Sequence, residues 1–226
     1  MLTKFLGTGG VFDYKYGNSS LTIDCGRRVL IDCGPLVFPR LVELSIIDSI
    51  DYLLLTHLHG DHTGSIFQLS FYTMGVLKHP LKILYATDAF RKQIETLLAA
   101  QGVPPTHFVM CPLQEVSEIR AFDTTNKHAV GVISFAYLFD FGGEKVFYSG
   151  DLGDINVTKA ILADIKPSEV IVFHEMHHKE GKAHVHYSEL NRLMPKYNVF
   201  GYHCNPDLIP SDNNVPLVAD QKPFLW

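Results

Sequence analysis

The chain has 226 residues, of which 46% are hydrophobic and 19% charged, a balance that supports a full hydrophobic core and excludes disorder. Its formal net charge of −5 and the lack of any basic cluster argue against long nucleic acids as principal partners. No apolar run is long enough to cross a bilayer, and glycines interrupt the N-terminal apolar stretch. We therefore expect one cytoplasmic domain over residues 1–226 that uses no membrane.

The first half of the chain alternates short apolar runs with helical patterns. Its predicted strands cover residues 2–6, 20–24, 28–32, 51–55 and 82–85, and Gly26 marks a hairpin turn between the second and third. Its predicted helices cover residues 37–45, 63–72 and 88–100. The strand at 51–55 runs directly into the sequence Thr-His-Leu-His-Gly-Asp-His. Carboxyl ends of strands are where α/β sheets place ligands, so this polar cluster predicts a site.

The second half continues the alternation, which predicts an α/β (α+β) fold. We expect an extended stretch at 107–122, a hairpin of 130–139 with 145–148, helices at 156–163 and 188–194, and strands at 169–173 and 197–202. The last of these strands ends at His203. Residues 212–226 show no periodicity, so this tail either wraps the surface or docks on a partner.

Four metal-ligand side chains lie within six residues: His57, His59, Asp61 and His62. Imidazole and carboxylate groups together suit zinc or another borderline divalent ion. One short loop rarely wraps a single ion with four ligands. We therefore expect His57 and His59 to hold one ion, and Asp61 and His62 to hold a second.

A pair of ions needs further ligands, and later segments supply His128, Asp151 and His203 as candidates. Asp151 is the natural bridge between the ions. Two divalent cations with only two carboxylates leave a positive centre, which favours an anionic substrate. A hydroxide held between two such ions is a strong nucleophile at neutral pH, and the ions stabilise an in-line phosphoryl displacement. Zinc is the expected metal, with manganese as the alternative.

The Thr-His-Leu-His-Gly-Asp-His segment resembles the HxHxDH signature of the metallo-β-lactamase superfamily. This resemblance implies an αββα sandwich with a dinuclear metal centre. Within the superfamily, residues 5–10 and 18–20 resemble the opening glycine-rich turn and strand of the ribonuclease Z branch and its phosphodiesterase relatives.

Two further segments resemble motifs of the same branch, with departures. His174-Glu175-Met176-His177 is similar to its HEAT motif but differs in the last two residues, and His186-Tyr187-Ser188 is similar to its HST motif but lacks the Thr. By this resemblance Glu175 orients His186, which protonates the leaving oxygen, and Asp61 belongs to the catalytic centre. His184, two residues earlier, competes with His186 for the role of general acid.

Ribonuclease Z carries a long basic arm for tRNA between its third-motif His and its bridging Asp, whereas only 22 residues separate His128 from Asp151. Compact relatives hydrolyse cyclic phosphates and cyclic nucleotides, including phage-borne enzymes that destroy defence signals. The resemblance therefore implies a homodimeric, dinuclear metal phosphodiesterase that acts on a small anionic phosphodiester such as a cyclic nucleotide. The alternatives are a ribonuclease Z-type RNA endonuclease, a lactone or thioester hydrolase on the same metals, and a non-enzymatic nucleotide-binding protein.

Several of these residues also have a structural interpretation. His128 lies beside Asn126 and Lys127, which suit an exposed loop. The rings of Phe12, Tyr14 and Tyr16 could stack on a nucleobase, but a place in the core or on the surface is favoured for them.

Overall fold

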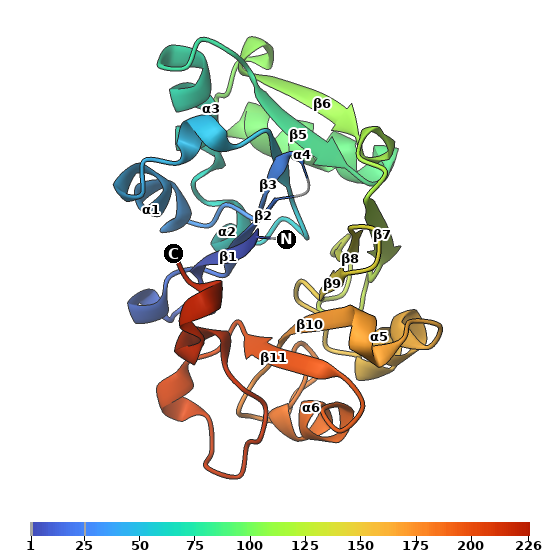
Figure 1. Ribbon diagram of the computed structural model, residues 1–226. Coiled ribbons are helices and arrows are strands. Elements are labelled where there is room, and N and C mark those ends of the chain that lie inside the picture. Colours follow the sequence, from blue (N-terminus) through green and yellow to red (C-terminus); the bar gives the residue numbers. More distant parts are fainter. Residues whose placement is uncertain (1, 25) are drawn as a thin grey trace.

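The computed structural model describes residues 2–24 and 26–226, and two β-sheets form its centre. The described residues of the N-terminal half form the first sheet, in the spatial order β1 (Leu2–Gly7), β2 (Ser20–Asp24), β3 (Arg28–Ile31), β4 (Tyr52–Leu54), β5 (Leu81–Tyr85) and β6 (Phe108–Pro112) (Figure 1). The pairs β1–β2 and β2–β3 are antiparallel, and the pairs from β3 to β6 are parallel. Strands β3 and β4 therefore end at the same edge of this sheet.

The second sheet comes from the C-terminal half. Its order is β11 (Asn198–Tyr202), β10 (Val170–Glu175), β9 (Lys145–Tyr148), β8 (Phe135–Asp140) and β7 (Ile119–Asp123). Strand β10 is parallel to both β9 and β11, whereas β8 is antiparallel to β9 and β7. Because β9, β10 and β11 run in one direction, the segments that follow them gather at one edge.

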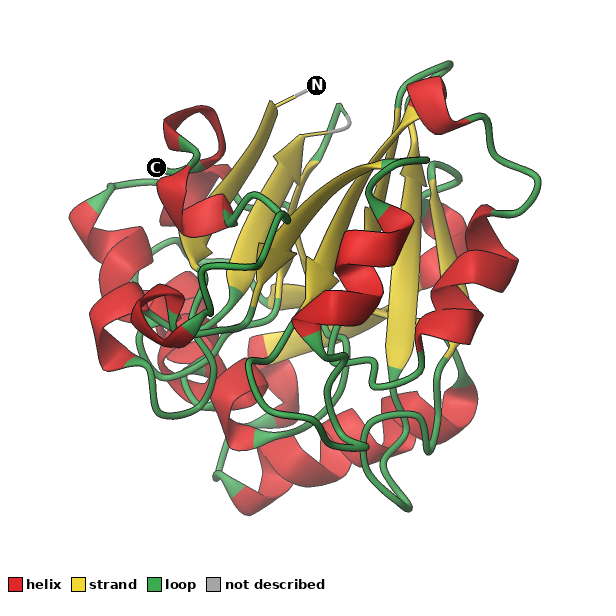
Figure 2. Cartoon of the chain, turned by 90° about the horizontal axis from the view of Figure 1, so that it is seen from below, coloured by secondary structure: helices red, strands yellow, loops and turns green. Residues whose placement is uncertain are grey.

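Helices cover the outer faces of the two sheets. The first sheet carries α1 (Val37–Glu43), α3 (Ile66–Gly75) and α4 (Asp88–Ala100), and the second carries α5 (Ile155–Leu162) and α6 (Tyr187–Leu193). In α4 the buried residues Phe90, Ile94 and Leu98 recur every four positions and so form one apolar face. Figure 2 shows the strands in the middle of the molecule with helices outside them. The αββα sandwich predicted from the sequence is confirmed.

The two sheets pack against each other through aromatic side chains. The ring of Phe5 in β1 meets that of Phe173 in β10 edge-on at 5.0 Å between centroids, and also contacts Tyr202 at 5.7 Å. The buried hydroxyl of Tyr137 in β8 donates a hydrogen bond of 2.7 Å to the carbonyl of Leu55 after β4. These contacts fix the edge that bears the metal-ligand motif relative to the second sheet.

Two predicted boundaries were wrong. The helix expected at 63–72 is two helices, α2 (Gly60–Thr63) and α3, because the buried Ser65 hydroxyl donates to the Gly34 carbonyl and accepts from the Phe38 amide at the break. The strand expected from residue 130 begins at Phe135. Residues 124–134 form a loop instead, in which the Asn126 side chain accepts a hydrogen bond from the amide of Gly131.

The tail at 212–226 wraps the surface of its own chain. Phe224 packs edge-on against Phe173 at 5.2 Å, and Trp226 donates a hydrogen bond of 3.1 Å to the Thr22 hydroxyl. Figure 1 shows this C-terminal segment beside β1. Among the described residues, no helix has the length and apolar character that a membrane crossing requires.

Candidate metal centre

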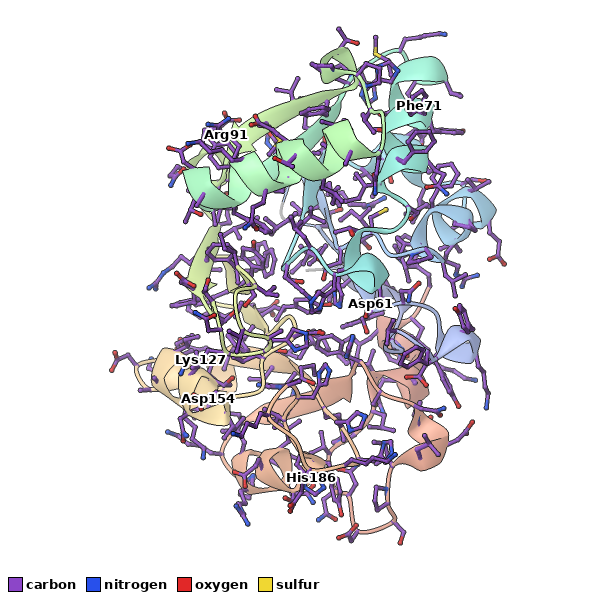
Figure 3. The ribbon with its side chains drawn as sticks, turned by 180° about the vertical axis from the view of Figure 1, so that it is seen from behind. Asp61, Phe71, Arg91, Lys127, Asp154 and His186 are labelled. Atoms are coloured by element: carbon purple, nitrogen blue, oxygen red, sulfur yellow. The ribbon has the colours of Figure 1, made fainter. Side chains whose placement is uncertain are left out.

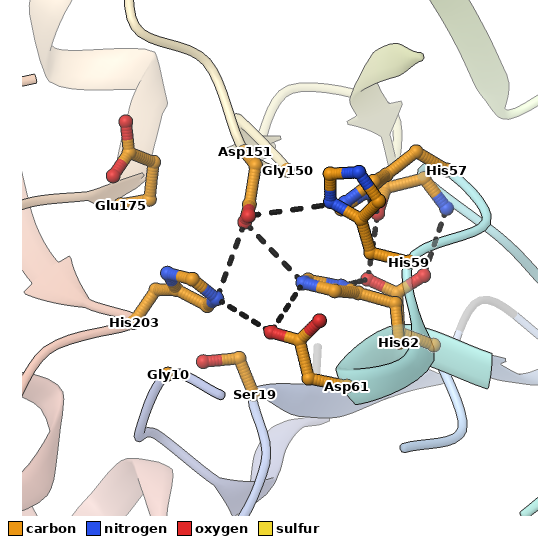
Figure 4. Close-up of polar contacts among 12 residues, drawn as sticks. Gly10, Ser19, His57, His59, Asp61, His62, Gly150, Asp151, Glu175 and His203 are labelled. Carbon is orange, nitrogen blue, oxygen red and sulfur yellow. Dashed lines mark hydrogen bonds and ion pairs between the residues drawn. The ribbon is translucent and has the colours of Figure 1, made fainter. Parts of the chain in front are cut away.

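The segment after β4 places four polar side chains at the carboxyl edge of the first sheet. His57 and His62 are fully buried, and Asp61 is 9% exposed, although such groups are rarely buried without a partner. The short helix α2 carries both Asp61 and His62, and it turns them toward the second sheet (Figure 4). The expected clustering of this motif is therefore present.

Asp151 follows β9 and lies at the middle of the cluster. Its Oδ1 atom is 3.4 Å from His62 Nε2 and 3.5 Å from His203 Nε2, and its Oδ2 atom is 3.8 Å from His57 Nε2 and 3.6 Å from His128 Nε2. The preceding Gly150 has φ of +58°, and a Cβ atom there would lie 2.9 Å from Thr56 Cβ. A glycine is therefore required to bring this carboxylate into place.

Six of the seven predicted ligands fall into two groups around the seventh, Asp151. His57, His59 and His128 form one group, in which His59 Nδ1 is 3.1 Å from His128 Nε2. Asp61, His62 and His203 form the other, in which Asp61 Oδ2 is 3.3 Å from His203 Nε2. The structure thus brings all seven side chains together. His57 and His62 also form a group with Asp151, so the division of the HxHxDH motif between two ions remains a prediction.

The polar atoms inside this cluster fit divalent cations. Among the described residues, His57 Nε2, His62 Nε2 and Asp151 Oδ1 are buried without a hydrogen-bond partner. Buried polar atoms are nearly always paired, so three unpaired atoms directed at a common region need an explanation. Imidazole nitrogens and carboxylate oxygens at this spacing are the donors that zinc and manganese take.

The pKa shifts of the clustered side chains are also those expected of residues that bind cations. Burial raises the pKa of Asp151, but the imidazoles of His203 and His62 outweigh it and hold that pKa well below its usual range. Burial lowers the pKa of His57, which keeps its ring neutral. For His62, burial is outweighed by Asp151 and Asp32, which raise its pKa well above the ordinary value. A divalent cation bound here would supply that positive charge in place of the proton.

A second polar pair, Glu175 and His184, adjoins the cluster. Glu175 is fully buried at the end of β10; its Oε2 atom is 3.0 Å from His184 Nδ1, and its Oε1 atom accepts a hydrogen bond of 2.8 Å from the Val185 amide. The ring of His184 stacks on that of His203 at 5.3 Å.

The predicted pairing of Glu175 with His186 was wrong. Both oxygens of Glu175 are taken by residues 184 and 185, whereas His186 directly precedes α6 and its Nδ1 pairs with the Ser188 hydroxyl at 2.9 Å. Figure 3 shows His186 beside α6 and Asp61 near the middle of the molecule. Of the two histidines that the sequence left in competition, the structure brings His184 to the cluster.

Comparison with known proteins assigns the chain to a family. A family model described as Anti-Pycsar protein Apyc1 matches residues 1–215. The chain belongs to the Anti-Pycsar protein Apyc1 family. The Apyc1 protein of Bacillus phage 010DV004 is 29% identical to it over 217 residues, which cover 84% of this chain and 82% of the phage protein.

Solved structures show the same fold as this member of the Apyc1 family. The metallo-β-lactamase fold protein YhfI from Bacillus subtilis has a TM-score of 0.72 at 20% identity, over 89% of this chain and 85% of that protein. The short form of human tRNase Z has a TM-score of 0.65 at 19% identity, over 92% of this chain and 95% of that protein. These likenesses show that the chain has the metallo-β-lactamase fold that the motif resemblance implied.

The sequence analysis missed one polar residue of this Apyc1-family site, Asp32. It directly follows β3 with φ of +60°, and it is fully buried. Its carboxylate accepts hydrogen bonds of 2.8 Å from the amide and the hydroxyl of Thr56, and its Oδ2 atom is 2.8 Å from His62 Nδ1. Asp32 therefore fixes the ring of His62 with Nε2 directed at the cluster. The sequence feature that could have identified Asp32 is the position of an acidic residue at the end of an apolar strand.

Replacing this carboxylate tests its positioning role. In the Asp32→Asn variant we expect metal affinity to fall about 10- to 100-fold, as is typical when an outer partner of a metal ligand is lost. Asn tolerates a positive φ, so the backbone should keep its conformation. Competition against a chromophoric chelator measures the affinity, and circular dichroism checks the fold. An unchanged metal dissociation constant would show that His62 does not depend on Asp32.

Proposed function

We propose that the chain is a dinuclear metal phosphodiesterase that hydrolyses the cyclic phosphodiester of a nucleoside cyclic monophosphate. The observation that carries this proposal is the position of Asp151 between two groups of His and Asp side chains, most of which are buried. A carboxylate placed in this way is suited to bridging a pair of cations, and paired cations are a recurrent means of hydrolysing phosphate esters. The name of the related phage protein, Anti-Pycsar protein Apyc1, supports the assignment.

In this proposal His57, His59, His128 and Asp151 hold one ion, and Asp61, His62, His203 and Asp151 hold the other. Zinc is the metal that these donors favour, with manganese as the second candidate. Bound in pairs, such ions act as Lewis acids on phosphate oxygens and lower the pKa of coordinated water. The charge of the two ions exceeds that of Asp61 and Asp151, so the centre attracts an anionic phosphodiester.

We assign the protonation of the leaving oxygen to His184. Its Nδ1 atom is held by Glu175, which leaves Nε2 as the nitrogen that is free to donate a proton. Burial lowers the pKa of this ring, but the hydrogen bond and charge of Glu175 outweigh it and raise the pKa to about 9. The imidazole therefore carries its proton at neutral pH, as a general acid must.

A ribonuclease Z-type activity is the weaker candidate. The segment between His128 and Asp151 is occupied by a short loop and the β8–β9 hairpin, with no room for an RNA-binding arm. The net charge of −5 also lacks the excess of cations that RNA binding requires.

A substrate panel tests the proposal. Purified, metal-loaded protein is incubated with cyclic purine and pyrimidine nucleotides, bis-p-nitrophenyl phosphate, a pre-tRNA, a lactone and a thioester. We expect cyclic nucleotides to be converted to linear monophosphates. Turnover of only the lactone or thioester would replace the proposal with an acyl hydrolase, and cleavage of only the pre-tRNA would replace it with an RNA endonuclease. Tight nucleotide binding with no product would replace it with a binding protein.

The homodimer implied by the family resemblance remains a prediction. The tail at 212–226, which the sequence offered as a cross-subunit element, packs on its own chain through Phe224 and Trp226. Light scattering of the purified protein measures the mass, and a monomeric mass would contradict this prediction.

A further inference from the structure

A cavity of about 300 Å³ opens beside the candidate metal centre. The buried ring of His203 and the half-buried ring of His184 line it, as do the exposed side chains of Val11, Phe12 and Leu208. The cavity therefore runs from the cluster to the surface. A phosphodiester bound at the cluster would extend one of its substituents into this space.

Phe12 is the most exposed aromatic side chain that lines the cavity, with 83% of its surface accessible. Among the described residues it makes no ring contact, although large apolar side chains are normally covered. Tyr14, two residues later, is 72% exposed but lines a different depression, together with Pro39 and Arg40. Phe12 and Tyr14 therefore line different depressions, although the sequence analysis gave both the same interpretation.

The loop that carries Phe12 is held in place relative to the cluster. The Gly10 amide donates a hydrogen bond of 3.1 Å to Asp13 Oδ2, and the Asp13 amide donates one of 3.2 Å to the Gly10 carbonyl. The His203 amide donates a hydrogen bond of 2.7 Å to the Thr8 carbonyl. The base of the loop that carries Phe12 is therefore tied to the backbone of His203, a candidate metal ligand.

The lining of the cavity also includes a row of imidazole rings. His178 stacks on His177 at 4.4 Å, His177 on His184 at 5.8 Å, and His184 on His203 at 5.3 Å, with interplanar angles of 26–30°. The lining therefore combines the phenyl ring of Phe12 with several imidazole rings. Such a lining favours a flat heteroaromatic group, which stacks on aromatic faces without needing charge.

The charge and size of the cavity further restrict the class of ligand that it suits. The Asp13 side chain lines it and disfavours a second phosphate group, as in an oligonucleotide or a nucleoside polyphosphate. Its volume is at the small end of the range of about 300 to 1,000 Å³ for small-molecule sites. One nucleoside suits this space better than a longer nucleic acid.

We propose that this cavity is the nucleoside subsite and that Phe12 is a specificity-determining residue, stacking on the nucleobase while the cyclic phosphate lies beside His184 and His203. The proposal rests on the proposed phosphodiesterase function, which it deepens by naming the group that is recognised beside the phosphate. Stacking tolerates every base, so Phe12 selects nucleotides over sugar phosphates and does not select among bases.

The test compares a cyclic nucleotide with its abasic analogue, 1-O-methylribose 3′,5′-cyclic phosphate, which is identical at phosphorus. In Phe12→Ala we expect KM for the cyclic nucleotide to rise about ten-fold, the loss of one base–aromatic stack, while kcat changes less than about two-fold. KM for the abasic analogue should stay as in the wild type. Phe12→Trp should restore the wild-type KM, and Tyr14→Ala, the matched exposed aromatic, should leave it unchanged.

Equilibrium binding supplies a second measurement. Calorimetric titration with a slowly hydrolysed cyclic phosphorothioate nucleotide should give a Kd for Phe12→Ala that is about ten-fold higher than that of the wild type. The subsite would be overturned if Phe12→Ala raised KM equally for the nucleotide and the abasic analogue. It would also be overturned if Tyr14→Ala raised KM for the nucleotide as much as Phe12→Ala does. Wild-type protein that hydrolyses both compounds with the same KM would overturn the subsite but leave the phosphodiesterase function standing. Inactivity toward both compounds would overturn the function itself.

Discussion

The Asp151→Asn variant should lose phosphodiesterase activity by a factor of about 10³ or more. Asp151 is the carboxylate that faces both groups of candidate ligands, with four imidazole nitrogens within 3.8 Å of its oxygens. The amide keeps the size of the side chain but removes the negative charge, so the two proposed ions would lose the carboxylate that they would share. The initial rate of cyclic nucleotide hydrolysis measures the effect.

The control for this variant is Asp140→Asn, because the half-exposed carboxylate of Asp140 pairs with Lys145 at 3.0 Å in the same sheet. We expect its activity to stay within about two-fold of the wild type, since exposed ion pairs contribute little. Thermal unfolding of both variants separates loss of the centre from loss of the fold. A folded Asp151→Asn protein with wild-type activity would show that the bridge between the two groups is not needed.

The His184→Ala variant should lower kcat for cyclic nucleotides about 10²- to 10³-fold, the usual contribution of a positioned general acid. The sugar alkoxide is a poor leaving group and needs a proton, whereas p-nitrophenolate leaves without one. The same variant should therefore lose much less activity on bis-p-nitrophenyl phosphate. The ratio of kcat values for the two substrates is the measurement, because a merely structural loss would lower both equally.

His186→Ala is the matched control for that experiment. The His186 ring pairs with Ser188 and lies against Tyr187, so its removal should change kcat less than about two-fold on either substrate. If His186→Ala were the variant that lost activity on cyclic nucleotides alone, the proton donor would be His186, as the motif resemblance implied. The assignment to His184 would then be wrong.

The sequence was sufficient for the parts of this molecule that local pattern determines. Apolar runs predicted nearly every strand, and the position of His57 to His62 directly after one of them predicted a site at a sheet edge. His203 directly follows β11, and Asp151 lies three residues after the end of β9. Since β9 and β11 are both parallel to β10, their ends meet at one edge, and the proximity of these two residues follows from that topology.

The remaining features depend on contacts between segments that local pattern does not determine. Asp32 reaches His62 only because β3 and β4 are neighbours in the sheet, which no motif records. The choice of His184 over His186 depends on which residues of the loop after β10 meet the buried carboxylate of Glu175. The separation of Phe12 from Tyr14 depends on how one short loop folds against His203.

Elemental analysis of the purified wild-type protein tests the central claim most directly. If Asp151 and the six side chains around it hold a pair of cations, the protein should contain two divalent ions per chain, zinc or manganese, and removal of both by a chelator should abolish hydrolysis until metal is returned. A protein that hydrolyses cyclic nucleotides with no bound metal, or that binds no more than one ion per chain when fully active, would contradict the account.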